Sequence, residues 1–214
     1  MVAAALGYAY IDTGAMYRAV TLYFLDHHVS LTNPKEVKEA LSNIEIEFHY
    51  NPKTKRNEVF LNGLNVEDEI RKMYISNQVS EVSVVAEVRR AMVAQQQKMG
   101  RKRGVVMDGR DIGTAVFPDA EVKIFMTADV DTRAKRRQVE LLEKKQLVNL
   151  DEIKQNLQKR DHIDSTRAES PLRRAEDAAL LDTSHMTIDE QVDFVLERVT
   201  SALISEEEKA VKQD

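Results

Sequence analysis

Two aspartates and an arginine stand together in the segment Asp108-Gly109-Arg110-Asp111. Apolar runs at 104–107 and 122–126 bracket the loop that begins there and ends near Pro118. Buried strands of a parallel sheet read as continuous apolar runs, and ligands bind where such strands end. Carboxylates and a guanidinium at that place suit a polar, anionic ligand. The alternative is a solvated turn with an Asp-Gly signal.

Arginine gathers in further clusters along the chain. Residues 133–137 place Arg133, Arg136 and Arg137 on one helical face, just after an expected Asp129 cap, where the helix dipole disfavours cations. Residues 160–167 and 12–18 also combine arginine with a short carboxylate or hydroxyl residue. Guanidinium groups match phosphate in shape and charge, so these clusters together favour a nucleotide ligand. A solvated helix face is the alternative for 133–137.

Other chemistries find less support. The chain has no cysteine, which excludes disulfides, thiolate nucleophiles and cysteine-based metal sites. Its five histidines show no metal-ligand spacing, and no G-x-S-x-G segment occurs. We therefore expect neither a metalloenzyme of the histidine type nor a serine hydrolase.

Composition indicates one globular core. The chain has 214 residues, of which 43% are apolar and 31% charged, and its net charge is −5. The negative charge argues against a general nucleic-acid binder, and no run approaches the roughly 18 apolar residues that cross a bilayer. We expect a cytoplasmic protein that acts on small molecules, with no nucleic-acid or membrane partner.

Periodicity predicts alternating helices and strands, and hence an α/β protein with a mainly parallel sheet. Strict alternation at 44–48 marks a small antiparallel insert within 44–66. The predicted helices cover 2–6, 15–26, 74–99, 130–145, 150–161 and 187–204, the other strands cover 8–11, 104–107, 122–126 and 179–181, and 162–174 and 205–214 are predicted as a loop and a solvated end.

Several long segments together resemble the bacterial cytidylate kinases of the nucleoside-monophosphate kinase superfamily. The resemblance runs from Tyr8 to the final helix and rests on residues 10–18, 108–114, 116–120, 160–167, 170–172 and 181–184. It implies a monomer with a P-loop kinase-like three-layer fold, a parallel sheet and one domain over 1–214. The implied parts are a core (1–35, 87–130, 175–204), a monophosphate-binding insert with a small antiparallel sheet (36–86) and a helical lid (131–174).

The resemblance also implies an activity, which is transfer of the γ-phosphoryl group of ATP to CMP or dCMP, giving ADP and CDP or dCDP. Mg²⁺ would bridge the donor phosphates, although no metal ligands are identified in the chain. The residues implied in phosphoryl transfer are Arg110, Arg160 and the lid arginines Arg133, Arg136 and Arg137.

Substrate-binding roles follow from the same resemblance, position by position. Arg18, Arg110 and Arg160 would grip the acceptor phosphate, with Thr13 beside it. Cytosine would be bound by Ser80, Arg89 and Asp111. Asp164 would hold the ribose hydroxyls, and Arg167 would lie across the nucleotide.

One departure from the family pattern concerns the donor site. The family begins with a strand that runs into a G-x-x-x-x-G-K-[ST] loop, and no Gly-Lys pair occurs in these 214 residues. We therefore expect the first strand and the phosphate loop to be absent from this chain, and its turnover to be poor. The alternative is a non-catalytic nucleotide-binding or interaction protein that has lost the ATP site. A related kinase with another acceptor is disfavoured by residues 108–113 and 160–167.

Overall fold

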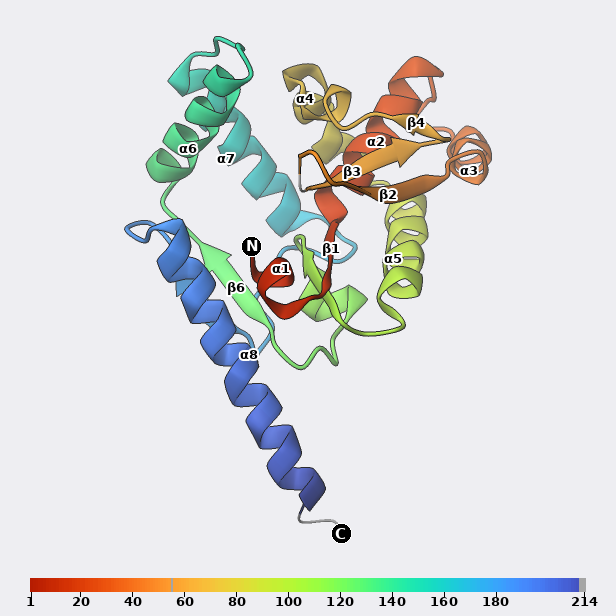
Figure 1. The fold of residues 1–214 in the computed structure, drawn as a ribbon. Coiled ribbons are helices and arrows are strands. Elements are labelled where there is room, and N and C mark those ends of the chain that lie inside the picture. The colour runs from red at the N-terminus through yellow and green to blue at the C-terminus, as the bar shows by residue number, and fades with distance from the viewer. Residues whose placement is uncertain (55, 212–214) are drawn as a thin grey trace.

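The structure, a computed structural model, describes residues 1–54 and 56–211. Helices α6 and α7 stand together on one side of the molecule, the β2–β4 sheet lies on the other, and the end of α8 projects away from both (Figure 1). The helical elements are α1 (Val2–Leu6), α2 (Thr13–Asp26), α3 (Pro34–Ser42), η1 (Glu69–Arg71), α4 (Met73–Ser83), α5 (Ala86–Gly100), η2 (Ile112–Val116), α6 (Val130–Glu143), α7 (Leu150–Thr166) and α8 (Ile188–Val211). The strands are β1 (Ala9–Asp12), β2 (Ile46–Asn51), β3 (Arg56–Leu61), β4 (Leu64–Asn65), β5 (Val105–Asp108), β6 (Ile124–Thr127) and β7 (Ala179–Asp182).

The antiparallel insert is confirmed. Strands β2, β3 and β4 form one sheet in that order, with Ile46 opposite Leu61 and Phe48 opposite Val59. Ile46, Val59 and Leu61 are buried, because alternation along the strands turns one face of the sheet toward the core.

Parallel pairing is confirmed as well, in two separate two-stranded sheets. Strand β1 pairs with β5 and β6 pairs with β7, which brings Asp12 opposite Asp108 at one set of carboxyl ends. Within the described ranges, β5 has no second neighbour and neither has β6. The side chains of these strands are more exposed to solvent than is usual in a parallel sheet, since Met126 is 55% exposed and Tyr10 is 40% exposed.

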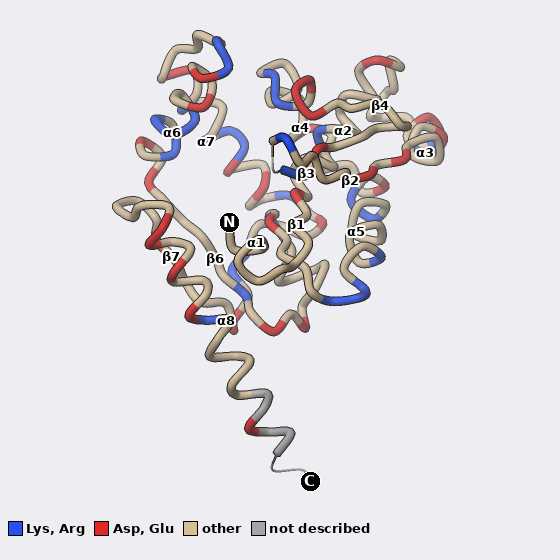
Figure 2. The backbone as a smooth tube through the Cα atoms, in the orientation of Figure 1, with Lys and Arg blue, Asp and Glu red and all other residues tan. Residues whose placement is uncertain are grey.

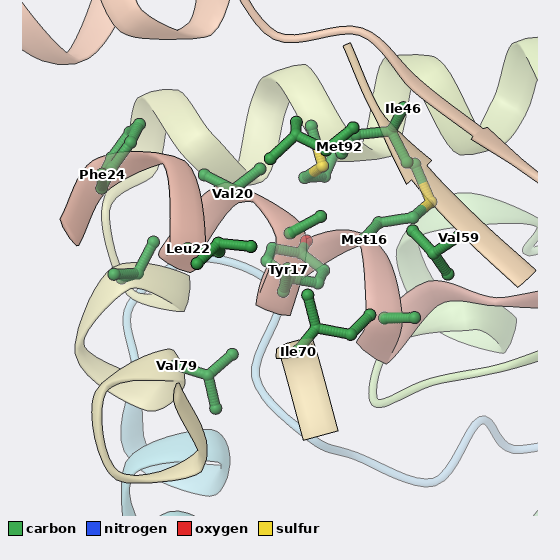
Figure 3. Close-up of a cluster of buried hydrophobic side chains, with 14 of the residues drawn as sticks. Met16, Tyr17, Val20, Leu22, Phe24, Ile46, Val59, Ile70, Val79 and Met92 are labelled. Atoms are coloured by element: carbon green, nitrogen blue, oxygen red, sulfur yellow. The ribbon is translucent and has the colours of Figure 1, made fainter. Parts of the chain in front are cut away.

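Helix α2 is the centre of the core. Met16 and Val20 are completely buried, and they lie among side chains from the insert and from α5, including Val59 and Met92 (Figure 3). Ile70 of η1 joins the same cluster. The insert therefore shares its core with the helix that follows β1, which fixes the insert relative to the end of that strand.

The prediction of a single helix over 74–99 is wrong in one respect. The segment forms two helices, α4 and α5. Val85 has extended backbone angles (φ −66°, ψ 121°) and precedes the first residue of α5. The break leaves the carbonyl of Ser83 at the end of α4, where Arg89 Nη1 donates to it at 3.3 Å. The apolar stripe runs through both helices without interruption, so periodicity could not reveal the break.

Other boundaries also differ from prediction. The predicted loop over 162–174 is helical as far as Thr166, and the predicted solvated end is helical as far as Val211, with 212–214 outside the described residues. Residues 112–116 form a π-helical turn, η2, within the predicted 108–118 loop. None of the helices in the described parts of the chain combines the length and the apolar character that a membrane span requires.

Candidate functional site

The carboxyl ends of β1 and β5 are locked together by short polar contacts. The Thr13 hydroxyl donates to the carbonyl oxygen of Asp108 at 2.6 Å. A Cβ atom on Gly109 would lie 2.4 Å from Thr13 Oγ1, so only glycine fits at this close approach. Asp12 caps α2, since its Oδ1 accepts from the Ala15 amide at 2.8 Å.

The pKa values of Asp12 and Asp108 are shifted in opposite directions. Burial raises the pKa of Asp12, but Arg18 and Arg71 outweigh burial and the net pKa is lowered. The pKa of Asp108 is raised, first by desolvation and then by the neighbouring Asp12 carboxylate. Tyr10 donates to Asp108 Oδ1 at 2.9 Å, and its own pKa is raised by burial and by both carboxylates.

A buried ion pair lies beyond this strand end. Arg89 of α5 donates to Asp111 Oδ2, and the two side chains are only 2% and 4% exposed. Ser80 is buried on α4, and its carbonyl accepts from the Ser83 hydroxyl at 2.9 Å. The Ser83 carbonyl also accepts from Arg89, so Ser80 is connected to the ion pair through its backbone carbonyl and Ser83.

Two residues behind this pair escaped the sequence prediction. The Arg89 guanidinium lies 5.2 Å from the ring centre of Tyr17, in cation–π geometry. Gln96 is completely buried, and among the described residues neither its side-chain nitrogen nor its side-chain oxygen has a hydrogen-bond partner. The available signal was a glutamine at a core position, one turn after the buried Met92 on α5.

Asp164 joins two further predicted residues. Its Oδ2 accepts from Arg110 Nε and its Oδ1 accepts from Arg167 Nη1, both at 3.0 Å. Arg167 also donates to the Ser170 carbonyl at 2.8 Å and 3.0 Å. Burial is the main reason that the pKa of Arg167 is lowered, and the nearby Arg89 lowers it further.

Four arginines line a cavity of about 110 Å³ between α2, η1, α4, α6 and α7. Figure 2 shows basic positions on both the α6–α7 side and the α2–α4 side of this part of the molecule. The cationic lining residues are Arg18, Arg71, Arg137 and Arg160, and the others are Met73, Ser76, Ile153, Asn156 and Leu157.

Arg160 is the cation least compensated in this cavity. Among the described residues it forms no ion pair, and its Nε is buried without a hydrogen-bond partner. Burial lowers its pKa to about 10, and the neighbouring Arg110 contributes to the shift. Such a group favours an anionic ligand, because an anion would offset both the desolvation and the repulsion.

Arg71 is the cavity arginine that sequence reasoning missed. Its Nη2 lies 2.8 Å from Asp12 Oδ2 and 2.9 Å from Glu67 Oε1. Its backbone carbonyl accepts from Arg137 Nη2 at 3.4 Å. Nothing in the local sequence marks this position, which the folding of η1 against α2 brings to the site.

The predicted lid arginines diverge in the structure. Asp129 caps α6 as predicted, accepting from the Thr132 amide at 2.7 Å. Arg133 contacts Asp161 of α7 at 2.7 Å, whereas Arg136 donates to the Thr183 carbonyl, beyond β7, at 2.6 Å. Only Arg137 of the three reaches the cavity.

Comparison with known proteins shows the family of this chain. Residues 1–201 match the family described as cytidylate kinase. A cytidylate kinase of Cytophaga hutchinsonii is 60% identical over 204 residues, which cover 95% of this chain and 87% of that protein. Those of Parabacteroides distasonis and Flavobacterium psychrophilum are 52% and 48% identical, each over 92% of this chain and 88% of the relative. The chain belongs to the cytidylate kinase family.

The acidic and histidine side chains of this cytidylate kinase family member are dispersed in the described part of the chain. Its described residues contain no cluster of three or more histidine and acidic side chains that could hold a metal ion. The parallel register of β1 and β5 does bring two carboxylates, Asp12 and Asp108, opposite each other. Two carboxylates suffice for Mg²⁺ where substrate phosphates and water complete the coordination.

Proposed function

We propose that this protein transfers the γ-phosphoryl group of ATP to CMP or dCMP. The observation that carries the proposal is the arginine-lined cavity, in which Arg160 has no ion-pair partner in the described chain. Phosphoryl transfer asks a protein chiefly for positioning and charge stabilisation, which arginines supply. The acceptor is itself a phosphate with free oxygens, so no general base is required.

The buried pair of Arg89 and Asp111, with Ser80, is the proposed cytosine-binding end. Cytosine presents an exocyclic amine, a donor, where uracil presents a carbonyl, an acceptor. A carboxylate such as Asp111 can accept from the amine, and Arg89 can donate to the ring acceptors. Uracil would leave a buried partner unpaired, which costs about 1–3 kcal/mol.

The remaining substrate-binding residues are assigned by the same proposal. Arg18, Arg110 and Arg160 bind the acceptor phosphate, and Thr13 lies beside it at the β1–β5 strand ends. Asp164 binds the ribose hydroxyls. Its current partners Arg110 and Arg167 then keep its carboxylate oriented. The proposed lid residues are Arg133, Arg136 and Arg137.

Mg²⁺ fits the Asp12 and Asp108 pair. Desolvation and the Asp12 charge raise the pKa of Asp108, and a divalent cation would relieve that repulsion. Bound there with ATP, Mg²⁺ would neutralise charge on the donor phosphates. Asp108 is the better candidate ligand, because both oxygens of Asp12 already accept hydrogen bonds.

The proposal assigns only the acceptor half of the reaction to these 214 residues. They contain no G-x-x-x-x-G-K-[ST] segment, and in the described part of the chain β5 and β6 each pair with one strand, which leaves each with an edge that a further parallel strand could join. Such a strand, followed by a phosphate loop, would complete the three-layer fold and the donor site. We therefore expect this chain alone to transfer phosphate poorly.

Calorimetric titration of the 214-residue chain with CMP, dCMP, UMP and cytidine tests the acceptor site, and a coupled assay with ATP and Mg²⁺ tests transfer. CMP should bind more tightly than both UMP and cytidine. Equal affinity for CMP and UMP would contradict the cytosine assignment. Specific CMP binding without transfer, even in a form extended by a phosphate loop, would favour the non-catalytic alternative.

A further inference from the structure

Arg71 occupies an unusual position between two acidic residues and the cavity. It is the last residue of η1, which joins the β2–β4 insert to α4. Glu67 accepts from Arg71 Nε at 3.0 Å and lies 2.9 Å from Nη2, while Asp12 contacts the same Nη2 at 2.8 Å. The guanidinium is mostly buried, with 22% of the side chain exposed, and it lines the cavity.

The charges around the cavity do not balance. Of its four guanidinium groups, Arg18 and Arg71 share the Asp12 carboxylate, and Arg137 contacts Glu140 at 2.6 Å. The Nε of Arg18 is buried and has no hydrogen-bond partner within residues 1–54 and 56–211. Cations are therefore crowded into a space that holds too few acceptors.

We propose that Arg71 is a phosphate-binding residue, which donates to a phosphoryl oxygen held in this cavity by Arg18, Arg137 and Arg160. In the structure, the Asp12 carboxylate takes the place of that oxygen on Nη2. An arriving phosphate competes with Asp12 for Arg71, while Glu67 retains Nε and keeps the guanidinium plane in position. No bond other than hydrogen bonds forms or breaks in this exchange.

The same contact connects the insert to the lid. Arg137 of α6 donates to the backbone carbonyl of Arg71, and both side chains line the cavity. A phosphate bound between them would hold α6 against η1. The lid and the insert would then both contact the same anion. Arg18 alone could not link them, because it lies on the core helix α2.

A purely structural role for Arg71 makes a different prediction. The ion pairs with Asp12 and Glu67 also tie the insert to the end of β1. If that were their whole purpose, replacing Arg71 would lower stability and would weaken every ligand alike. A phosphate-binding role predicts a selective loss of ligands that carry phosphate.

The test compares Arg71→Met with Lys72→Met, which removes a neighbouring exposed cation paired with Glu69. Inorganic phosphate, CMP and cytidine are titrated into the 214-residue protein by calorimetry. We expect Arg71→Met to weaken phosphate and CMP roughly tenfold or more and to leave cytidine unchanged, since hydrogen bonds to charged groups contribute about 1.5–3 kcal/mol. Lys72→Met should bind all three like the parent protein.

Several outcomes would overturn the proposal. They are an unchanged phosphate affinity in Arg71→Met, no phosphate binding by the parent protein, and an equal loss for CMP and cytidine. Should Arg71→Met fail to fold, Arg71→Lys decides, because it keeps the charge but loses the planar two-nitrogen contact. An intermediate loss of phosphate affinity in Arg71→Lys supports the proposal, and parent-like affinity overturns it.

A parallel titration with ATP shows which nucleotide supplies the phosphate. Loss of CMP affinity alone assigns Arg71 to the acceptor, and loss of ATP affinity alone assigns it to the transferred group. Only the identity of the nucleotide rests on the proposed function. If CMP is not a substrate but inorganic phosphate binds through Arg71, the function fails and this inference stands.

Discussion

The two ends of the proposed substrate site are built on opposite electrostatic principles. At the base end, one cation and one carboxylate, Arg89 and Asp111, form a buried one-to-one pair. At the phosphate end, four arginines surround a cavity, and Arg160 has no ion-pair partner in the described chain. The charges at the base end are thus paired before a ligand arrives, although Arg89 Nε is buried without a hydrogen-bond partner in the described chain. The phosphate end, in contrast, requires an anion to balance its charges.

This difference separates selectivity from affinity. A preformed buried pair rejects a wrong base by leaving one of its own groups unpaired. An uncompensated cationic cavity instead gains strongly from any correctly shaped anion. Removing a charge should therefore damage folding at the base end and ligand binding at the phosphate end.

The largest effect should come from Asp111→Ala. It leaves the Arg89 guanidinium buried and unpaired, which costs about 3–5 kcal/mol of unfolding free energy. Urea unfolding followed by circular dichroism measures it. The control is the double variant Arg89→Met/Asp111→Leu, which should recover much of the stability because it leaves no buried charge. A loss below about 1 kcal/mol in the single variant would show that the pair is not a closed unit.

Arg160→Met should weaken ligand binding without lowering stability. The change removes a buried cation that has no ion-pair partner in the described part of the chain, so the unfolding free energy in phosphate-free buffer should stay constant or rise. CMP affinity should fall roughly tenfold to a hundredfold, since a charged hydrogen bond contributes about 1.5–3 kcal/mol. Arg90→Met, which removes an exposed cation outside the cavity, is the matched control. A large loss of stability in Arg160→Met would erase the contrast between the two ends.

The aspartates at the strand ends should give opposite pH dependences. The pKa of Asp12 is lowered in the folded protein, so its carboxylate stabilises the fold above its unfolded pKa, and that stability disappears as pH falls through the folded pKa. Asp12→Asn should therefore be less stable than the parent at pH 7, with the difference vanishing in acid.

Asp108→Asn should behave in the opposite sense. The pKa of Asp108 is raised, so its ionised form destabilises the fold at pH 7. The variant should be more stable than the parent at pH 7, and the gain should shrink as pH falls through the raised pKa toward the unfolded value. Thermal melts across pH 3–8 compare the two variants, and pH profiles of the same sign would refute the assignment of the charges.

The smallest effect should come from Lys159→Met. Lys159 of α7 contacts Glu81 of α4 at 2.9 Å, but the side chains are 58% and 47% exposed. Exposed pairs contribute at most about 1 kcal/mol, and salt screens them. Denaturant unfolding at low and high salt should show a small difference that shrinks at high salt. A loss comparable to that of Asp111→Ala would mean that burial does not distinguish the two pairs.

Local sequence signals were enough for much of the fold. Gly7 ends α1 in the left-handed conformation (φ 67°), Asp129 caps α6, and the alternation at 44–48 marks the insert. The break between α4 and α5 was missed because the apolar stripe continues through it. The extension of α7 to Thr166 was missed because Asp164 gains partners from outside the local segment, Arg110 among them.

The residues of the site were predicted more successfully than the way in which they are grouped in space. The resemblance to cytidylate kinases implied that Arg89 and Asp111 act together, and the structure joins them across 22 residues. Sequence also placed Arg133, Arg136 and Arg137 on one helical face. Their contacts separate them, because α6 packs against α7 and also lies near the end of β7.

The sequence by itself determined which residues end the strands, cap the helices and carry charge near those ends, as at Asp12, Gly109 and Asp129. Short-range sterics and local hydrogen bonds decide these features, so they can be read from neighbouring residues. Only the tertiary structure decided that Arg71 and Arg160 face the same cavity. That convergence depends on how η1 and α7 pack against α2 and α4, which no local pattern of residues encodes.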